Sequence, residues 1–255
     1  MYKIDLNCDL GESFGNYTLG MDREVIPLIT SANVACGFHA SDPNTMADAV
    51  SMAKDGGTEV GAHPGYPDLL GFGRRNMVIS PDEAYAYTLY QLGALDAFLT
   101  AQGMKMQHVK PHGAMYNMAA KDYALAEAIV KAIRDFRKDL IVLALFGGQL
   151  EKASRDLGMR TASEFFADRA YNTDGTLVNR KLPGSMITDE EAAIERCVRM
   201  VKEHKVETIE GTDIDVDCVS ICVHGDNAKA LSFVERIRAA MAAEGVALCP
   251  LKDIV

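Results

Sequence analysis

The chain has 255 residues, of which 36 are acidic and 26 basic, and its formal net charge is −10. This charge disfavours nucleic acid or an anionic membrane as the main partner, although a local basic cluster can still bind a small anion. No apolar run approaches the roughly 20 residues of a membrane span, and the first residues enter a strand pattern directly, without a signal peptide. The six cysteines form no C-x-x-C pair, which indicates reduced, buried thiols in the cytoplasm and makes a catalytic Cys8 or Cys36 the weaker interpretation.

The N-terminal part of the chain alternates between strand and helix patterns. Residues 1–9 switch strictly between apolar and polar side chains, which predicts a strand with one face of each kind. Asp42 is the expected N-cap of a helix with Pro43 in its first turn, and Ser80 and Glu83 have the spacing of a capping box. In chain order, the further elements are a short helix within 21–30, a strand at 31–36, a helix at 43–57, a strand at 58–63, a helix at 80–102 and a strand at 108–112.

The C-terminal part continues this alternation. Residues 140–146 are apolar throughout, as expected of a strand that is buried on both faces. Thr188 opens a second capping-box pattern, and the helix after it is expected to end near His204. In chain order, the elements are a helix at 123–137, a strand at 140–146, a short helix ending near 157, a strand at 161–166, a helix at 188–204, a strand at 217–223, a helix at 227–244 and a short apolar tail at 246–255.

Seven strand-and-helix units without a linker or low-complexity run predict one α/β domain over residues 1–255. Two closures fit this pattern: an open, doubly wound sheet and a β/α barrel of seven strands. Side-chain parity favours the barrel, because the first, fourth and seventh strands each have an apolar and a polar face. An open sheet with helices on both sides should instead be apolar on both faces.

In a barrel, the strand positions with polar side chains face the lumen, so their ionisable groups lie around one opening. Burying so many ionisable groups without a use is costly, so together they indicate a functional site. These residues are Asp5, Asn7, Asp9, Asn33, His39, Glu59, His63, Lys110, His112 and His224.

Three histidines, His39, His63 and His112, each follow the end of a predicted strand. A single histidine in such a place is more often structural, but three on converging strand ends favour a site. Neutral imidazoles can act as general bases, or they can bind a divalent metal together with Asp9 or Glu12. Because the spacing offers no local ligand pair such as H-x-x-x-H, the metal site is the secondary interpretation.

The segment from Gly71 to Arg75 has the composition of an anion clamp. Its glycines let the backbone approach a ligand closely, and its guanidinium groups can bind carboxylate or phosphate in a bidentate manner. A solvated loop is an equally good interpretation. Lys110 has a stronger case, since a lysine facing the lumen needs a negative partner. No G-x-x-x-x-G-K-[ST] sequence occurs, so any nucleotide is bound without a P-loop.

Several acidic residues have a structural alternative. Asp42 and Asp226 both precede predicted helices, so N-capping explains them well. Glu164, Asp168 and Arg169 are most simply interpreted as an ion pair or a loop brace, with substrate contact as the second possibility.

Seven ordered motifs carry a resemblance that spans essentially the whole chain. They are Asp5–Glu12, Asn33–Asp42, Gly61–Asp68, Gly71–Arg75, Val109–Asn117, Phe166–Tyr171 and Ser220–Asp226. With these motifs the chain resembles the LamB/YcsF family, the A subunits of 5-oxoprolinase. The resemblance implies a seven-stranded β/α barrel similar to glycoside hydrolase and deacetylase barrels. It also implies ATP-dependent opening of the 5-oxoproline lactam to L-glutamate, together with two further subunits, B and C.

The resemblance gives the motif residues expected roles. Catalytic candidates, which include the group that activates water, are Asp9, Glu12, His39, His63 and His112. Substrate- or nucleotide-binding candidates are Asn7, Asn33, Arg74, Arg75, Lys110, Asp168, Arg169, His224 and Asp226. ATP is the expected co-substrate, and a divalent metal is a further candidate. Two other functions stay open: a metal-dependent amidohydrolase or polysaccharide-deacetylase-like enzyme, and a non-catalytic substrate-binding subunit.

Overall fold

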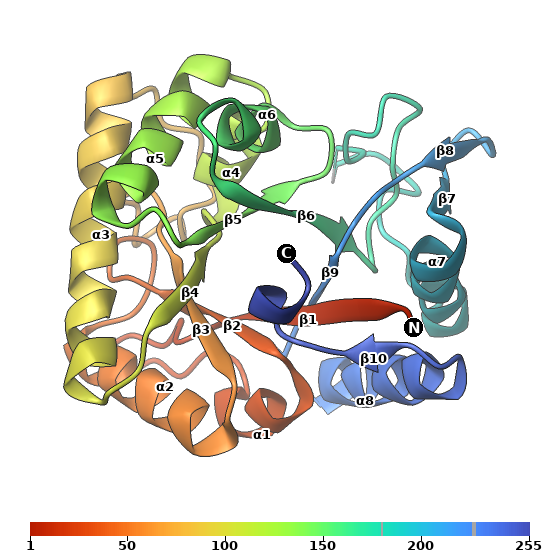
Figure 1. The fold of residues 1–255 in the computed structure, drawn as a ribbon, viewed down its shortest axis with the longest axis horizontal. Helices are drawn as coiled ribbons and strands as arrows, with labels where there is room; N and C mark the ends of the chain where they lie inside the picture. Colours follow the sequence, from red (N-terminus) through yellow and green to blue (C-terminus); the bar gives the residue numbers. More distant parts are fainter. Residues whose placement is uncertain (180, 226–227) are drawn as a thin grey trace.

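The computed structural model describes residues 1–179, 181–225 and 228–255. Its parallel strands close into a barrel, seen from one end in Figure 1, because β9 pairs with β6 on one side and with β1 on the other. The barrel strands are β1 (Lys3–Leu10), β2 (Ser31–Ala35), β3 (Glu59–His63), β4 (Met106–Val109), β5 (Ile141–Leu145), β6 (Arg160–Phe166) and β9 (Ser220–Val223). The predicted seven-stranded β/α barrel is therefore confirmed, and the open sheet is wrong.

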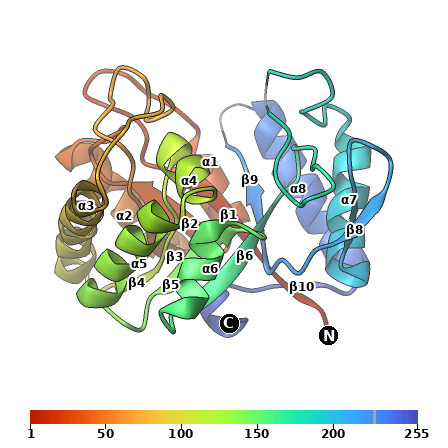
Figure 2. The same ribbon diagram turned by 90° about the horizontal axis from the view of Figure 1, so that it is seen from above.

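Helices pack around the outside of the barrel and bury the apolar parity of the strands (Figures 1 and 2). In β1, for example, Ile4 and Leu6 belong to the large hydrophobic core, while Asp5 and Asn7 face the lumen. The helices are α1 (Asp22–Val25), η1 (Ile26–Leu28), α2 (Pro43–Gly56), α3 (Pro81–Ala101), α4 (Gly113–Ala119), α5 (Tyr123–Phe136), α6 (Gln149–Asp156), α7 (Glu190–Glu203) and α8 (Ala228–Ala243).

The helix boundaries follow from local capping. Asp42 accepts hydrogen bonds from two backbone N–H groups of α2, and Gly57 ends that helix in the left-handed conformation with φ = 68°. Ser80 and Glu83 form the predicted capping box of α3. The second predicted capping box is wrong by one residue: Asp189, not Thr188, caps α7, because its carboxylate accepts from the first-turn N–H groups.

Several further features of the chain differ from the sequence prediction, among them helix α4, which no sequence pattern indicated. The fourth strand ends at Val109 and not at His112, since Pro111 has no N–H group to continue the ladder. The segment after α7 forms a small antiparallel hairpin of β7 (Lys205–Glu207) and β8 (Asp213–Asp215), which strand patterns this short did not reveal.

The C-terminal segment covers the amino end of the barrel. β10 (Ala247–Leu248) pairs with the start of β1, and η2 (Leu251–Asp253) follows it. Leu251 is fully buried against the lumen residues of β5 and β6. Glu59 lies at this end, in an ion pair with Lys252, so its predicted place at the mouth is wrong: it is the first residue of β3, and the mouth lies at the strand's other end.

The described residues contain no helix that is both long enough and apolar enough to cross a bilayer. Five of the six cysteines are buried, and all six are free thiols. This agrees with the predicted reduced state of the thiols.

Candidate active site

The lumen is filled by layers of polar side chains. In the deepest polar layer, the carboxylate of Asp5 accepts hydrogen bonds from the hydroxyl groups of Thr30, Ser31 and Ser220. Burial raises the pKa of Asp5 to about 6, although these hydrogen bonds oppose the shift. Asp5 is fully buried and lines none of the pockets at the mouth, so this layer supports the site from below.

The next layer joins Asn7, Asn33 and His108. Asn33 Nδ2 donates to Asn7 Oδ1 at 2.7 Å and to Asp9 Oδ1 at 2.9 Å. His108 Nε2 donates to Asn33 Oδ1 at 2.7 Å. Burial lowers the pKa of His108 to about 3, so the ring is neutral. The predicted binding residues Asn7 and Asn33 are therefore buried and contact Asp9 and Lys110 from beneath.

Lys110 lies at the centre of the barrel, 3% exposed, and three oxygens surround its ammonium group. Nζ lies 3.0 Å from Asn7 Oδ1, 3.2 Å from Asp9 Oδ1 and 2.7 Å from Glu164 Oε1. Burial by itself would lower the pKa of Lys110, but the nearby carboxylates of Asp9 and Glu164 outweigh it and raise the pKa well above its usual value. Because an ammonium has three protons, this lysine is saturated by protein acceptors.

Glu164 and Tyr116 extend this network toward the far wall. Glu164 is fully buried on β6, and its Oε2 accepts a hydrogen bond from the Tyr116 hydroxyl at 2.9 Å. Glu164 is an ion-pair residue, as the sequence suggested, but its partner is Lys110 and not the neighbouring Arg169. Sequence reasoning missed Tyr116 altogether, because it predicted no helix over residues 113–119, and so nothing indicated that this side chain lies over the lumen.

Asp9 is the carboxylate of this network that reaches open space. Its Oδ1 faces Asn33 and Lys110, and its Oδ2 lies 3.3 Å from His63 Nε2. Burial would raise the pKa of Asp9, but His63 and Lys110 lower it well below the usual value. Asp9 therefore stays ionised at the mouth of the barrel.

His63 and His112 share a defined hydrogen-bond pattern. His63 Nδ1 donates to the Lys110 carbonyl at 2.7 Å, and His112 Nε2 donates to the Phe72 carbonyl at 2.9 Å. The remaining nitrogens, His63 Nε2 and His112 Nδ1, lie 2.9 Å apart, so one proton is shared between them. Burial lowers the pKa of His112 well below its usual value, so this ring stays neutral, and the shared proton lies next to the Asp9 carboxylate.

His39 completes the cluster. Its ring stacks on His112 with the centroids 3.7 Å apart and an interplanar angle of 2°, and its Nε2 lies 3.1 Å from Glu12 Oε1. Burial lowers the pKa of His39 well below its usual value. Gly65 makes room for this ring, because a Cβ atom there would lie 2.6 Å from His39 Nδ1.

Glu12, His39, His63 and His112 fit a divalent cation in donor type and spacing. Their ligand atoms all lie within 4.8 Å of one another, and Glu12 Oε1 is 3.1 Å from His39 Nε2 and 3.4 Å from His112 Nδ1. A tetrahedral zinc site with ligand bonds of about 2.1 Å separates neighbouring ligand atoms by about 3.4 Å. The parallel stack of His39 on His112 would have to change when both rings bind one ion, since lone pairs in parallel planes do not converge.

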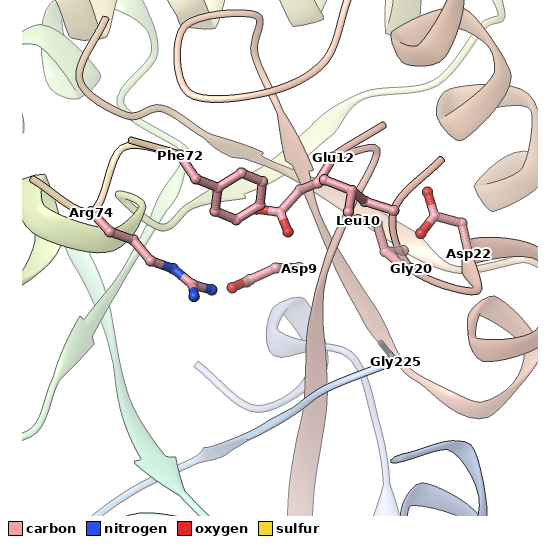
Figure 3. A pocket seen from close by; sticks show the side chains of 9 residues that line it. Asp9, Leu10, Glu12, Gly20, Asp22, Phe72, Arg74 and Gly225 are labelled. Atoms are coloured by element: carbon pink, nitrogen blue, oxygen red, sulfur yellow. The ribbon is translucent and has the colours of Figure 1, made fainter. Parts of the chain in front are cut away.

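Two connected pockets open above this cluster. The central pocket, of about 70 Å³, includes His63, Lys110, His112, Tyr116 and His224 in its lining. The acidic pocket, of about 380 Å³, includes Asp9, Glu12, Asp22, Phe72 and Arg74. Both pockets share Asp9 and Arg74, and Figure 3 shows the guanidinium of Arg74 directed toward the Asp9 carboxylate.

Of the other predicted site residues, some line the pockets at the mouth and others do not. Arg169 is buried and lines the central pocket, and His224 lies at its rim, 3.8 Å from Asp168. The structure does not bring Arg75 to the mouth, because its guanidinium is 66% exposed and pairs with Asp68. Asp226 lies outside the described residues.

The comparisons with known proteins agree along the whole chain. The sequence model of the LamB/YcsF family matches residues 4–255. A Clostridium beijerinckii protein named as the A subunit of 5-oxoprolinase is 59% identical over 254 residues, covering 100% of both chains, and a Bacillus subtilis protein of the same name is 50% identical over 253 residues, covering 99% of this chain and 98% of the relative. The crystal structure of the lactam utilization protein from Thermus thermophilus matches with a TM-score of 0.93 at 46% identity, covering 97% of this chain and 99% of the other. The chain is a member of the LamB/YcsF family.

Proposed function

We propose that this chain is the A subunit of an ATP-dependent 5-oxoprolinase, acting as one barrel domain over residues 1–255 in the cytoplasm with subunits B and C. The names of the relatives and of the Thermus thermophilus protein support the lactam as substrate. The observation that carries the proposal is the network of Asp9, Lys110 and the histidines, which borders both the central pocket and, at Asp9, the acidic pocket of about 380 Å³, a volume suited to a small, polar molecule.

The chemistry needs activation because the lactam is a poor electrophile. Transfer of the terminal phosphoryl group of ATP to the lactam oxygen makes the ring carbon open to attack. Water adds to that carbon, the ring C–N bond breaks as the nitrogen takes a proton, and a second water releases phosphate. In total, 5-oxoproline, ATP and two waters give L-glutamate, ADP and phosphate.

Asp9 and His63 have the geometry for the proton transfers. Asp9 is ionised and reaches the pocket, so it is the favoured general base for water. His63 Nε2 lies 2.9 Å from His112 Nδ1 and 3.3 Å from Asp9 Oδ2, so His63 is the favoured proton donor to the leaving nitrogen. His112 aligns His63, while Glu12 and His39 form the opposite wall of the cluster.

The cations divide between positioning and binding. Lys110 keeps Asp9 ionised, with Asn7 and Asn33 fixing both groups, because its protons already face protein oxygens. Arg74 lines both pockets beside Asp9 and is the favoured partner of the substrate carboxylate. Arg169, His224 and Asp168 are proposed to contact the substrate from the rim.

A metal-dependent amidohydrolase is the second candidate, favoured by the Glu12, His39, His63 and His112 cluster. A divalent cation held there would supply Lewis-acid chemistry and lower the pKa of a bound water. Stoichiometric zinc and chelator-sensitive amide hydrolysis without ATP or companion proteins would favour this candidate.

The deciding experiment measures glutamate release from 5-oxoproline and ATP by the complex reconstituted with subunits B and C. We expect His39→Ala, His63→Ala and His112→Ala each to abolish release, while His204→Ala, at a 58% exposed histidine far along the chain, retains it. Full activity of all three cluster variants would overturn the assignment. In that case, retained 5-oxoproline binding would identify a non-catalytic binding subunit.

A further inference from the structure

The mouth of the barrel has a third pocket, of about 310 Å³, whose charge differs from that of the acidic pocket. This basic pocket has Lys121 and Arg169 as its charged lining residues, with Asn76, Asn117 and Asn179 beside them. Among the described residues that line it there is no carboxylate, whereas Asp9, Glu12 and Asp22 all line the acidic pocket. In a chain of net charge −10, a cavity whose described charged lining residues are a lysine and an arginine is suited to a negatively charged group.

The basic pocket adjoins the central pocket. Asn117, Arg169 and Leu177 line both of them, so the two pockets meet at these side chains. The central pocket thus lies between an acidic and a basic compartment. An anionic substituent of the ligand is repelled from the first and attracted to the second.

The groups of the basic pocket are held in place. Arg169 is 6% exposed, and its Nη2 donates to the Val178 carbonyl at 2.7 Å, which fixes the guanidinium at the pocket wall. Asn117 Nδ2 donates to the Gly113 carbonyl within α4. The side-chain oxygen of Asn179 accepts from a backbone N–H, which leaves its amide N–H groups as donors for a ligand.

Lys121 lies at the outer edge of the same pocket. Its charge helps to lower the pKa of Asp174, whose carboxylate already accepts from the backbone N–H and the hydroxyl of Thr176. No described carboxylate lies within ion-pair distance of Lys121, so its ammonium is available to a ligand.

We infer that the basic pocket is a phosphoryl-binding subsite, in which Lys121, Arg169 and the asparagine amides hold the phosphoryl group of a phosphorylated ligand whose reacting carbon lies beside Asp9. Charged donors and amide N–H groups together match a tetrahedral dianion with several acceptor oxygens. This inference rests on the proposed function, since the activated lactam carries such a group, and it fixes the orientation: phosphoryl group toward α4 and Arg169, ring toward Asp9 and His63.

The test is binding of inorganic phosphate to the full chain, followed by isothermal titration calorimetry and by the ³¹P resonance of phosphate. The two test variants are Lys121→Gln and Asn117→Asp, which lower the positive charge of the pocket by one unit each. Lys105→Gln is the matched control, because this exposed lysine precedes β4 at the opposite end of the barrel. Acetate and chloride at equal ionic strength distinguish a phosphoryl subsite from a general anion or carboxylate pocket.

We expect the wild type to bind phosphate in preference to acetate and chloride, and each test variant to bind it about tenfold more weakly, as loss of a charge-assisted hydrogen bond predicts. Lys105→Gln should bind like the wild type. Equal phosphate affinity in the wild type and both test variants, or displacement of phosphate by acetate at equal concentration, would overturn the subsite.

This outcome is separable from that of the proposed function. Phosphate binding is measured without 5-oxoproline, ATP or companion proteins, whereas the function is judged by glutamate release. A chain that binds phosphate at this pocket but fails to support lactam turnover in the complex would keep the subsite and refute the function. If the complex turns over the lactam but the test variants bind phosphate as tightly as the wild type, the function is kept and the subsite is refuted.

Discussion

Lys110 Nζ and Glu164 Oε1 lie 2.7 Å apart inside the barrel, where the lysine is 3% exposed and the glutamate not at all. Removing one partner of a buried ion pair leaves the other charge uncompensated, which costs about 3–5 kcal/mol. Glu164→Gln preserves the shape and removes the charge, so we expect a loss of unfolding free energy of about 3 kcal/mol in urea denaturation. Glutamate release by the complex should fall with it, because Lys110 also fixes Asp9.

The matched control for this change is Glu59→Gln. Glu59 also pairs with a lysine, Lys252, but both side chains are partly exposed at the amino end of the barrel. An exposed pair contributes less than about 1 kcal/mol, so this variant should unfold and react like the wild type. Equal stability losses in the two variants would show that the buried ion pair contributes no more to the free energy of unfolding than the exposed one.

Gly65→Ala tests how tightly the histidine cluster is packed. The added Cβ atom would lie 2.6 Å from His39 Nδ1, and the surrounding side chains are buried, so the ring must shift. We expect a loss of about 2 kcal/mol in stability, as for other overpacked cores, and reduced glutamate release. Gly93→Ala in α3 is the control: nothing lies within 4 Å of its Cβ position, and it should gain about 1 kcal/mol. A Gly65→Ala protein as stable and active as the wild type would contradict the packing argument.

Asp5 gives the stability of the protein a specific pH dependence. Its pKa is about 6 in the folded protein and 3.8 as an ordinary carboxyl, so the folded state binds more protons between these values. The group therefore opposes folding as pH rises through 6, by about 3 kcal/mol, and has no such effect below pH ~4. Asp5→Asn should remove this dependence, which urea unfolding at pH 4 and pH 7.5 would measure.

The exposed Asp48 on α2 offers the comparison for Asp5. Asp48→Asn should follow the wild-type pH profile, whereas Asp5→Asn should be more stable than the wild type at pH 7.5 relative to pH 4. Parallel profiles for all three proteins would refute the contribution of Asp5.

Zinc binding is the direct measurement for the Glu12, His39, His63 and His112 cluster. We expect about one equivalent of zinc to be retained after dialysis, with protons released on binding, because the ion replaces the proton shared by His63 and His112. His39→Gln should lose the ion, and His204→Gln, which changes an exposed histidine outside the cluster, should keep it. Equal zinc content in the two variants, or none in the wild type, would exclude this cluster as a metal site.

Side-chain parity was sufficient to predict the barrel and most of its polar lumen. The alternation through Asp5, Asn7 and Asp9 places three carboxylate or amide groups inside, and the structure has all three there. Parity alone does not give height along the barrel axis, which is why Glu59 was expected at the mouth but lies at the amino end. Height depends on which residue starts each strand, a property that local pattern fixes only to within a few positions.

Contacts between loops were the part that the sequence did not predict. Arg74 and Arg75 are adjacent and chemically alike, yet Arg74 lines both pockets while Arg75 pairs with Asp68 outside them. Tyr116 was missed for a related reason: its hydroxyl group finds Glu164 only through tertiary packing of α4 over the barrel. Which side chain reaches which partner depends on the path of the backbone between strands and helices. The residue type by itself does not reveal that path.

The pairing of β10 with the start of β1, and the cover that η2 forms, place both ends of the chain on the side away from the mouth (Figure 2). A fusion partner, an affinity tag or a surface tether attached at either end is therefore directed away from the mouth of the barrel. The chain can be immobilised through its N- or C-terminus for binding measurements, with the mouth left accessible to small molecules and to companion proteins.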